Sequence, residues 1–307
     1  MKEYVIETKQ VTKSYGSILA LDNVSVHVKR GDIYGLIGDN GAGKTTLLKT
    51  LSGHIWPAKG EVSLFGAKGE KNLNQYRKQI GCMIEEPGFF PNLSVEKNIE
   101  YYRILKGIPG KERTKEVLQL VGLWDRKKSK GRELSMGMKQ RLGLAIAMIG
   151  EPSLLILDEP INGLDPSGIV EFRNILKRLN QEKNITILLS SHILPELQQT
   201  ATVFGFMSRG KLMEEIGIQK LKEKCADFLE ITVSDAKTYA ALLDHTFPQE
   251  HYQVLPDQMI RIFHPHNQVE TYSALAAQNS ILIVGLERHQ CSLETYYMNL
   301  KGDVSYA

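Results

Sequence analysis

The chain of 307 residues contains only three cysteines, Cys82, Cys225 and Cys291, which lie far apart in the sequence. They are too few for a disulfide framework and have no metal-site spacing, so a reduced, cytosolic setting is expected. No stretch approaches the roughly 20 apolar residues that a membrane span needs. Residues 1–10 are too polar for a signal peptide. If the protein works at a membrane, another chain must cross it.

An excess of one charge is also missing. The 38 lysines and arginines against 35 acidic residues give a net charge of +3, which is too small to indicate a nucleic-acid partner. The densest basic cluster, residues 126–132, is typical of a solvated loop; contact with a phosphate or an anionic membrane face is the alternative. The hydrophobic content of 42% is ordinary for a globular protein, and the length allows two domains.

The most informative stretch is GDNGAGKTT, which runs from Gly38 to Thr46 and fits the phosphate-binding template G-x-x-x-x-G-K-[ST]. A buried strand is predicted before it, over residues 32–37, and a helix after it, over residues 45–52. Glycines let the backbone fold around a diphosphate with its N–H groups pointing inward, and the helix N-terminus favours negative charge. The sequence therefore predicts a nucleoside triphosphate site. Its residues are Asn40, Gly41, Ala42, Gly43, Lys44, Thr45 and Thr46.

Two side chains of this loop have distinct predicted roles. Lys44 is expected to reach the β- and γ-phosphates, and the Thr45 hydroxyl to bind Mg²⁺. A second motif, LLILDEP, places the acidic residues Asp158 and Glu159 at the carboxyl end of a buried strand, where open α/β sheets bind ligands. Asp158 is expected to hold Mg²⁺ directly or through water. Glu159 points elsewhere and is predicted to polarise an attacking water.

The hydrophobic patterns predict an α/β domain with a mainly parallel sheet covered by helices. Residues 4–31 are expected to be β-structure, and residues 87–150 a mostly helical insertion. The other predicted strands are 61–65, 80–84, 154–157, 185–189 and a hairpin at 203–213, and the predicted helices are 95–106, 111–121, 136–149 and 168–183.

The character of the sequence changes near Gly217, so we predict a nucleotide-binding domain over residues 1–216 and an accessory α+β domain over residues 217–307. Predicted strands and helices alternate there as β-α-β-β-α-β, which suggests a ferredoxin-like module. The segment SLETYYMNL is expected to form a closing helix. The predicted strands are 228–233, 252–255, 259–263 and 281–286, and the helices are 236–245 and 267–278.

Several motifs occur together in one order: the phosphate-binding loop, LSMGMKQR at 134–141, LLILDEP, GLDP at 163–166 and His192 after ILLSS. This series resembles an ATP-binding cassette (ABC) ATPase over residues 15–192. The resemblance implies ATP as the nucleotide, Mg²⁺ as its cation, and catalysis by Glu159 as general base together with His192 and Lys44. Without the family, His192 would more often be a core or surface histidine.

The resemblance also implies a working dimer. Tyr15 resembles the aromatic residue that stacks on adenine, although a strand-end tyrosine alone more often serves packing. Ser135 and Gly137 occupy the signature motif, which contacts the γ-phosphate of the nucleotide held by the opposite subunit. Asp165 matches the loop that couples the two sites. One copy then carries half of each site, and a second nucleotide-binding subunit completes it.

Two positions depart from the family pattern. Met136 occupies a signature position that usually holds glycine, which could alter nucleotide approach or dimer affinity. Glu85 stands where the family normally has glutamine. It still offers oxygen to Mg²⁺, together with Thr45 and Asp158, but adds negative charge near the phosphates.

Glu85, the GMKQR segment and the SLETYY-like ending are similar to the cassettes of bacitracin-type and lantibiotic self-protection exporters. This similarity implies a subunit at the cytoplasmic face of the cell membrane that powers a separate integral membrane permease, with no nucleic-acid partner. Alternatives are a soluble ABC ATPase acting on ribosomes or DNA, an importer ATPase with a regulatory C-terminal domain, and a P-loop kinase or GTPase.

Overall fold

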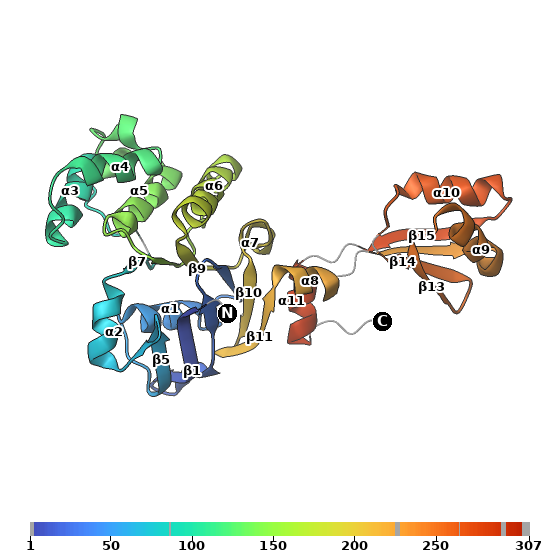
Figure 1. Cartoon of the computed structure of the whole chain (residues 1–307), viewed down its shortest axis with the longest axis horizontal. Coiled ribbons are helices and arrows are strands. Elements are labelled where there is room, and N and C mark those ends of the chain that lie inside the picture. Colours follow the sequence, from blue (N-terminus) through green and yellow to red (C-terminus); the bar gives the residue numbers. More distant parts are fainter. Residues whose placement is uncertain (1–2, 86, 225–227, 264, 290–292, 303–307) are drawn as a thin grey trace. The chain divides into compact units, whose positions relative to one another are not determined.

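The structure is a computed structural model that describes residues 3–302, except 86, 225–227, 264 and 290–292. Two compact units make up the chain, Met1–Ile218 and Gln219–Ala307. Each unit has its own sheet structure (Figure 1). Each also has its own buried core. In the described residues, no helix combines the length and hydropathy required to cross a bilayer.

A six-stranded sheet forms the centre of the first unit, with the strand order β11-β10-β4-β9-β8-β7. The strands from β10 to β7 run parallel, and β11 pairs antiparallel with β10. Every residue of β4, β8 and β9 is buried, as expected for parallel strands covered on both faces. The predicted, mainly parallel α/β sheet is confirmed. The strands are β4 Ile33–Ile37, β7 Ile80–Met83, β8 Leu154–Leu157, β9 Thr186–Ser191, β10 Val203–Ser208 and β11 Lys211–Gly217.

Helices α6 and α7 contact β9 and β4 of this sheet. Helix α6 begins at Pro166, two residues earlier than predicted, because proline suits the first helical position and Asp165 precedes it as the N-cap residue. Helices α2 and α7 were not predicted; α2 buries only Leu73 and therefore has no apolar stripe to reveal it. The bounds are α1 Lys44–Ser52, α2 Glu70–Arg77, α6 Pro166–Lys183 and α7 Leu194–Thr200.

A second, antiparallel sheet lies in the same unit, with the order β2-β1-β5-β6 and β3 beside β1. Its alternating valines Val24, Val26 and Val28 are fully buried, as the sequence pattern indicated. The predicted β-structure near the N-terminus is therefore confirmed. The strands are β1 Tyr4–Tyr15, β2 Ile18–Val24, β3 His27–Lys29, β5 Lys59–Leu64 and β6 Ala67–Lys68.

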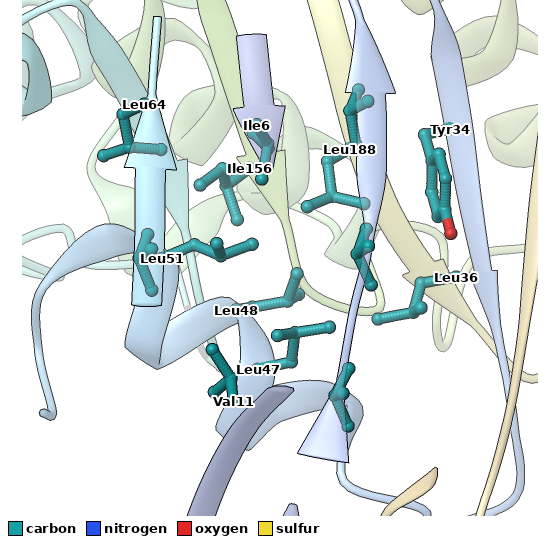
Figure 2. Packing of buried hydrophobic residues seen from close by; sticks show 14 of the residues in the cluster. Ile6, Val11, Tyr34, Leu36, Leu47, Leu48, Leu51, Leu64, Ile156 and Leu188 are labelled. Carbon is teal, nitrogen blue, oxygen red and sulfur yellow. The ribbon is translucent and has the colours of Figure 1, made fainter. Parts of the chain in front are cut away.

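Helix α1 packs between these two sheets (Figure 2). Its side chains Leu47, Leu48 and Leu51 are fully buried. Burial of one such side chain contributes roughly 1.5–3 kcal/mol, so the three leucines hold the helix firmly in place. The loop that precedes α1 is thereby fixed relative to both sheets. Residues of the antiparallel sheet in this core are Ile6, Val11 and Leu64, and those of the parallel sheet are Leu36, Ile156 and Leu188.

A partly buried polar contact also ties the sheets together. The Tyr34 hydroxyl on β4 donates to Glu215 Oε1 on β11 at 2.7 Å, and the same oxygen accepts from the His27 N–H on β3 at 2.8 Å. Burial, followed by the charge of Glu215, raises the pKa of Tyr34 well above its ordinary value. Tyr34 therefore stays protonated and keeps its hydrogen bond.

Residues between β7 and β8 form the predicted helical insertion. Helix α3 begins after Ser94, whose hydroxyl accepts from the Lys97 N–H at 3.2 Å. Helix α5 begins after Ser135, whose hydroxyl accepts from the Met138 N–H at 3.3 Å. Both are typical serine N-caps. The helices are α3 Val95–Leu105, α4 Glu112–Leu120, the 3₁₀ turns η1 Trp124–Arg126 and η2 Gly131–Glu133, and α5 Met136–Met148.

The second unit has an antiparallel sheet with the order β13-β14-β12-β15. With one helix after the first strand and another after the third, this order confirms the predicted ferredoxin-like topology. Tyr239 of the helix after the first strand and Tyr272 of the helix after the third are fully buried in the core of this unit. Lys224 of α8 donates to the Tyr296 hydroxyl of α11 at 3.1 Å. The elements are α8 Ile218–Lys224, β12 Phe228–Val233, α9 Ala236–Thr246, β13 His251–Leu255, β14 Met259–Phe263, α10 Val269–Gln278, β15 Ile283–His289 and α11 Leu293–Lys301.

Candidate functional site

The loop between β4 and α1 depends on glycine. Gly43, the N-cap residue of α1, has a φ of 104°, and a Cβ added there would lie 2.5 Å from the Ala20 carbonyl oxygen. Gly41 has a φ of 83°. The turn between β10 and β11 contacts the loop, because the Gly210 N–H donates to the Ala42 carbonyl at 3.0 Å. The loop is therefore a fixed backbone cradle rather than a free turn.

Lys44 lies at the start of α1 and is only 6% exposed. Its Nζ donates to the Gly38 carbonyl at 2.6 Å and to the Asp39 carbonyl at 3.2 Å. It also forms an ion pair with Glu159 Oε1 at 3.3 Å. These contacts hold the ammonium group across the loop, where its charge can stabilise a bound phosphate.

The neighbouring strand ends bring Asp158 close to Ser190. Leu157 and Leu189 are partners in the parallel pair of β8 and β9, so the residues that follow them lie side by side. The Ser190 hydroxyl donates to Asp158 Oδ1 at 2.6 Å and accepts from the Glu159 N–H at 2.9 Å. One buried hydroxyl thus orients both acidic residues. Ser190 was not predicted as a site residue, although the register of two predicted parallel strands could have revealed it.

Glu159 contacts two of the predicted site residues. Its φ of 46° is in the left-handed region, which is uncommon outside glycine and often found at functional sites. Its Oε2 lies 2.9 Å from His192 Nδ1, while Oε1 contacts Lys44. The structure therefore brings Lys44, Asp158, Glu159 and His192 together. A carboxylate held between two side chains in this way can accept a proton from a water molecule.

Replacing Ser190 by alanine is expected to lower the maximal rate of nucleotide hydrolysis at least tenfold, because the buried Asp158 carboxylate loses a partner, which costs roughly 1–3 kcal/mol, and the Glu159 N–H loses one too. Steady-state ATPase assays measure the change. Ser191→Ala is the matched control, since the neighbouring Ser191 hydroxyl instead accepts from the Ile193 N–H. Equal losses in the two variants would contradict a positioning role for Ser190.

The other loop residues surround this group. Asn40 and Gly41 are exposed, Ala42 is buried, and Thr45 and Thr46 are half-buried in the first turn of α1. The first N–H groups of a helix have no acceptor within the helix, so this turn favours a bound anion. Tyr15 lies at the end of β1 and is 48% exposed, with Lys13 Nζ at 5.5 Å from its ring centre. Its ring is therefore free to stack on a planar ligand.

A hollow of about 340 Å³ adjoins the acidic residues; we call it the carboxylate hollow. The Asp158 N–H donates to the Met83 carbonyl at 2.7 Å, which fixes the end of β7 beside the end of β8. Glu85 follows β7 with a φ of 64°, and its Oε1 forms an ion pair with Lys49 Nζ on α1 at 2.5 Å. The lining residues are Glu85, Pro87, Met136, Gln140, Asp158, Glu159, Asn162 and Gly163.

The donors near the hollow suit magnesium in chemical type. Thr45, Asp158 and Glu85 offer hydroxyl and carboxylate oxygens, the hard ligands that Mg²⁺ prefers. Among the described residues there is no cluster of three or more His, Cys, Asp or Glu side chains that could hold a metal alone. This pattern fits an ion that is bound mainly through substrate phosphates and one or two carboxylates.

The remaining predicted residues lie at two helix starts in the first unit. Ser135 is exposed at the tip of α5, and a Cβ added at Gly137 would meet Leu164 at 3.8 Å. Asp165 is exposed before α6; a hydrogen bond from the Ser167 hydroxyl lowers its pKa, so it stays ionised. Met136 is 47% exposed and lines the carboxylate hollow next to Gly163.

The fold combines a glycine-rich loop before α1 with acidic residues after β8. This combination defines a nucleotide-hydrolysing cassette. The ABC transporter family model matches residues 21–162. The chain is 41% identical over 98% of its length to the bacitracin transport ATP-binding protein BcrA of Enterococcus faecalis, covering 97% of that protein. It is also 41% identical to the lantibiotic transport ATP-binding protein SrtF of Streptococcus pyogenes, over 69% of this chain and 90% of that one. The chain belongs to the ABC transporter family.

Solved structures agree with this assignment. The ATP-binding cassette MJ0796, a dimer bound to ADP and phosphate, matches with a TM-score of 0.64 and 26% identity over 69% of this chain and 98% of that one. The predictions of an ABC-type ATPase and of a transporter subunit, rather than a soluble ATPase of ribosomes or DNA, are confirmed. The protein binds and hydrolyses ATP as a subunit of a transporter.

Proposed function

We propose that this subunit powers the export of a peptide antibiotic, or resistance to one, through a separate membrane-spanning permease at the cytoplasmic face of the cell membrane. The observation that carries the proposal is the match to a bacitracin transport protein along almost the whole chain, including the C-terminal unit. The lantibiotic relative supports the same class of cargo, since both named compounds are peptides with antibacterial activity. Residues 217–307 are proposed to be a separate accessory domain.

In the proposed mechanism two copies of the chain close head to tail on two ATP molecules. The phosphate loop of one copy, with Lys44, holds each triphosphate, and Ser135 and Gly137 of the other copy contact its γ-phosphate. The exposure of the Ser135 helix tip supports this role, because a capped helix start presents unused N–H groups to an anion. Asp165, exposed and ionised, lies in the loop that couples the two sites.

Hydrolysis requires a base and a cation. Glu159 takes the proton of the attacking water, while His192 holds its carboxylate in place at the distance given above. Thr45, Asp158 and Glu85 would hold Mg²⁺, which neutralises phosphate charge during the reaction. Ser190 keeps Asp158 and Glu159 correctly oriented.

The permease is proposed to dock on the surface formed by the loop after Glu85 and the outer face of α3. Phe90, Tyr101, Ile104 and Leu105 are 41%, 45%, 66% and 68% exposed. The Phe90 and Tyr101 rings lie 4.7 Å apart in edge-to-face contact. An exposed group of large apolar side chains is typical of a protein interface.

The function is tested in cells that carry the gene. Deleting it should sensitise them to a peptide antibiotic such as bacitracin or a lantibiotic, and the tagged chain should co-purify from membranes with a membrane-spanning protein. Complementation with the wild-type chain restores resistance, whereas the Glu159→Gln variant does not. Unchanged sensitivity to both classes of peptide would refute the proposed cargo and would leave the assignment as an ATPase intact.

Replacing Tyr15 by alanine is expected to weaken ATP binding about tenfold, since base–aromatic stacking contributes roughly 1–3 kcal/mol. The maximal hydrolysis rate should change little. Titration with a fluorescent ATP analogue measures the affinity. Tyr4→Ala is the control, because Tyr4 is similarly exposed, at 40%, at the opposite end of the same strand. An unchanged affinity for Tyr15→Ala would leave Tyr15 as a packing residue.

A further inference from the structure

Glu85 forms an ion pair with a lysine side chain. Glutamine, which the family usually has at this position, is neutral and could not form one. Its Oε1 lies 2.5 Å from Lys49 Nζ. The Lys49 side chain is 27% exposed and that of Glu85 is 63% exposed. The left-handed backbone of Glu85 costs energy in a residue other than glycine, and such strain is common where a segment has two arrangements.

Lys49 lies close to the residues that are proposed to hold Mg²⁺. Lys49 is four residues after Thr45 in α1, so the two side chains share one face of the helix. Glu85 and Asp158 both line the carboxylate hollow, at the ends of the adjacent strands β7 and β8. The ion pair therefore lies beside the hydroxyl and the carboxylate that are proposed to hold Mg²⁺.

We propose that Lys49 and the nucleotide-bound divalent cation compete for the carboxylate of Glu85, so that Lys49 is a positioning residue that sets the metal affinity of the site. The proposal rests on the nucleotide and metal site described under the proposed function. Metal binding then requires Glu85 to leave Lys49. Glu85 begins the loop that leads to α3. The exchange therefore couples the position of that loop to binding of the metal.

The competition is tested by direct titration with Mn²⁺, a spectroscopic substitute for Mg²⁺, in the presence of a saturating non-hydrolysable ATP analogue. Electron paramagnetic resonance measures free Mn²⁺, so the readout is metal affinity rather than turnover. We expect Lys49→Gln to bind Mn²⁺ roughly fivefold more tightly, as expected for loss of a partly exposed ion pair. Lys49→Arg, which keeps the pair, should have wild-type affinity. Lys49→Met serves as a second neutral variant if Lys49→Gln unfolds.

A double-variant cycle identifies the route of the effect. If Lys49 acts through Glu85, adding Lys49→Gln to a Glu85→Gln chain should leave the Mn²⁺ affinity unchanged. An equal gain in both backgrounds would mean that Lys49 acts only by direct repulsion of the metal, and would overturn the proposal. Lys68→Gln is the matched control, because it breaks another exposed ion pair, with Glu61 at 2.9 Å, and should have no effect.

The remaining outcomes separate this proposal from the proposed function. If the wild-type chain binds the Mn²⁺–nucleotide complex and the neutral variants bind it with the same affinity, the Lys49 exchange is refuted and the metal site stands. If the wild-type chain binds no Mn²⁺ with the analogue, the proposed metal site fails, and the exchange fails with it.

Discussion

The Glu159→Gln variant should bind ATP with near wild-type affinity and hydrolyse it about 10²–10⁴-fold more slowly, the typical cost of removing a general base. Glutamine keeps the size of the side chain and can still contact Lys44 and His192, which lie 3.3 Å and 2.9 Å from the carboxylate oxygens. It cannot accept the proton of the attacking water. Single-turnover hydrolysis and a binding titration together separate loss of chemistry from loss of binding.

The same variant should also accumulate as an ATP-bound dimer, because closure no longer leads to hydrolysis. Analytical ultracentrifugation with and without Mg²⁺ and ATP measures this association. Glu61→Gln is a suitable control, since Glu61 is an exposed carboxylate on β5 that pairs with Lys68. Near-normal turnover in Glu159→Gln would refute the role assigned to Glu159. Rapid hydrolysis by a chain kept strictly monomeric would refute the shared site.

The two elements that carry the phosphate loop and the acidic pair were predictable because their signals are local. The strand before Gly38, the glycine at the N-cap of α1 and the four apolar residues before Asp158 each specify their own conformation. The ferredoxin-like order of the C-terminal unit was also predictable, since its strands and helices alternate clearly. In these segments local propensity and tertiary packing favour the same structure.

Other features depend on contacts between distant parts of the chain. Ser190 contacts Asp158 because two strands pair in a particular register, and Lys49 of α1 meets Glu85 across 36 positions of sequence. Lys49 belongs to no motif, and Ser190 lies in the ILLSS run before His192 without standing out in it. The tie between Tyr34 and Glu215 joins residues that are 181 positions apart. Such pairs follow from the assembled sheet, and no single stretch of sequence indicates them.

Replacing Gly43 by alanine is expected to weaken ATP binding by about 30-fold or more. The φ of 104° disfavours any side chain, which costs roughly 1–2 kcal/mol. In addition, the new Cβ would lie 2.5 Å from the Ala20 carbonyl oxygen, a contact that neither backbone can relieve without moving. A combined cost of about 2 kcal/mol corresponds to the stated change in affinity. The same fluorescent-analogue titration measures it.

Gly66→Ala separates the clash from the strain. Gly66 has a similar left-handed φ of 78°, in the turn between β5 and β6, but an added Cβ there meets no atom within 4 Å. Thermal unfolding should show a loss of about 1 kcal/mol for Gly66→Ala, with unchanged ATP affinity. Ala20 precedes Leu21 of β2, which is buried in the core that holds α1. If Gly43→Ala displaced the backbone of Ala20, it would therefore disturb this core. Wild-type ATP affinity in Gly43→Ala would mean that the cradle can open without losing its ligand, and the rigid loop would no longer explain phosphate binding.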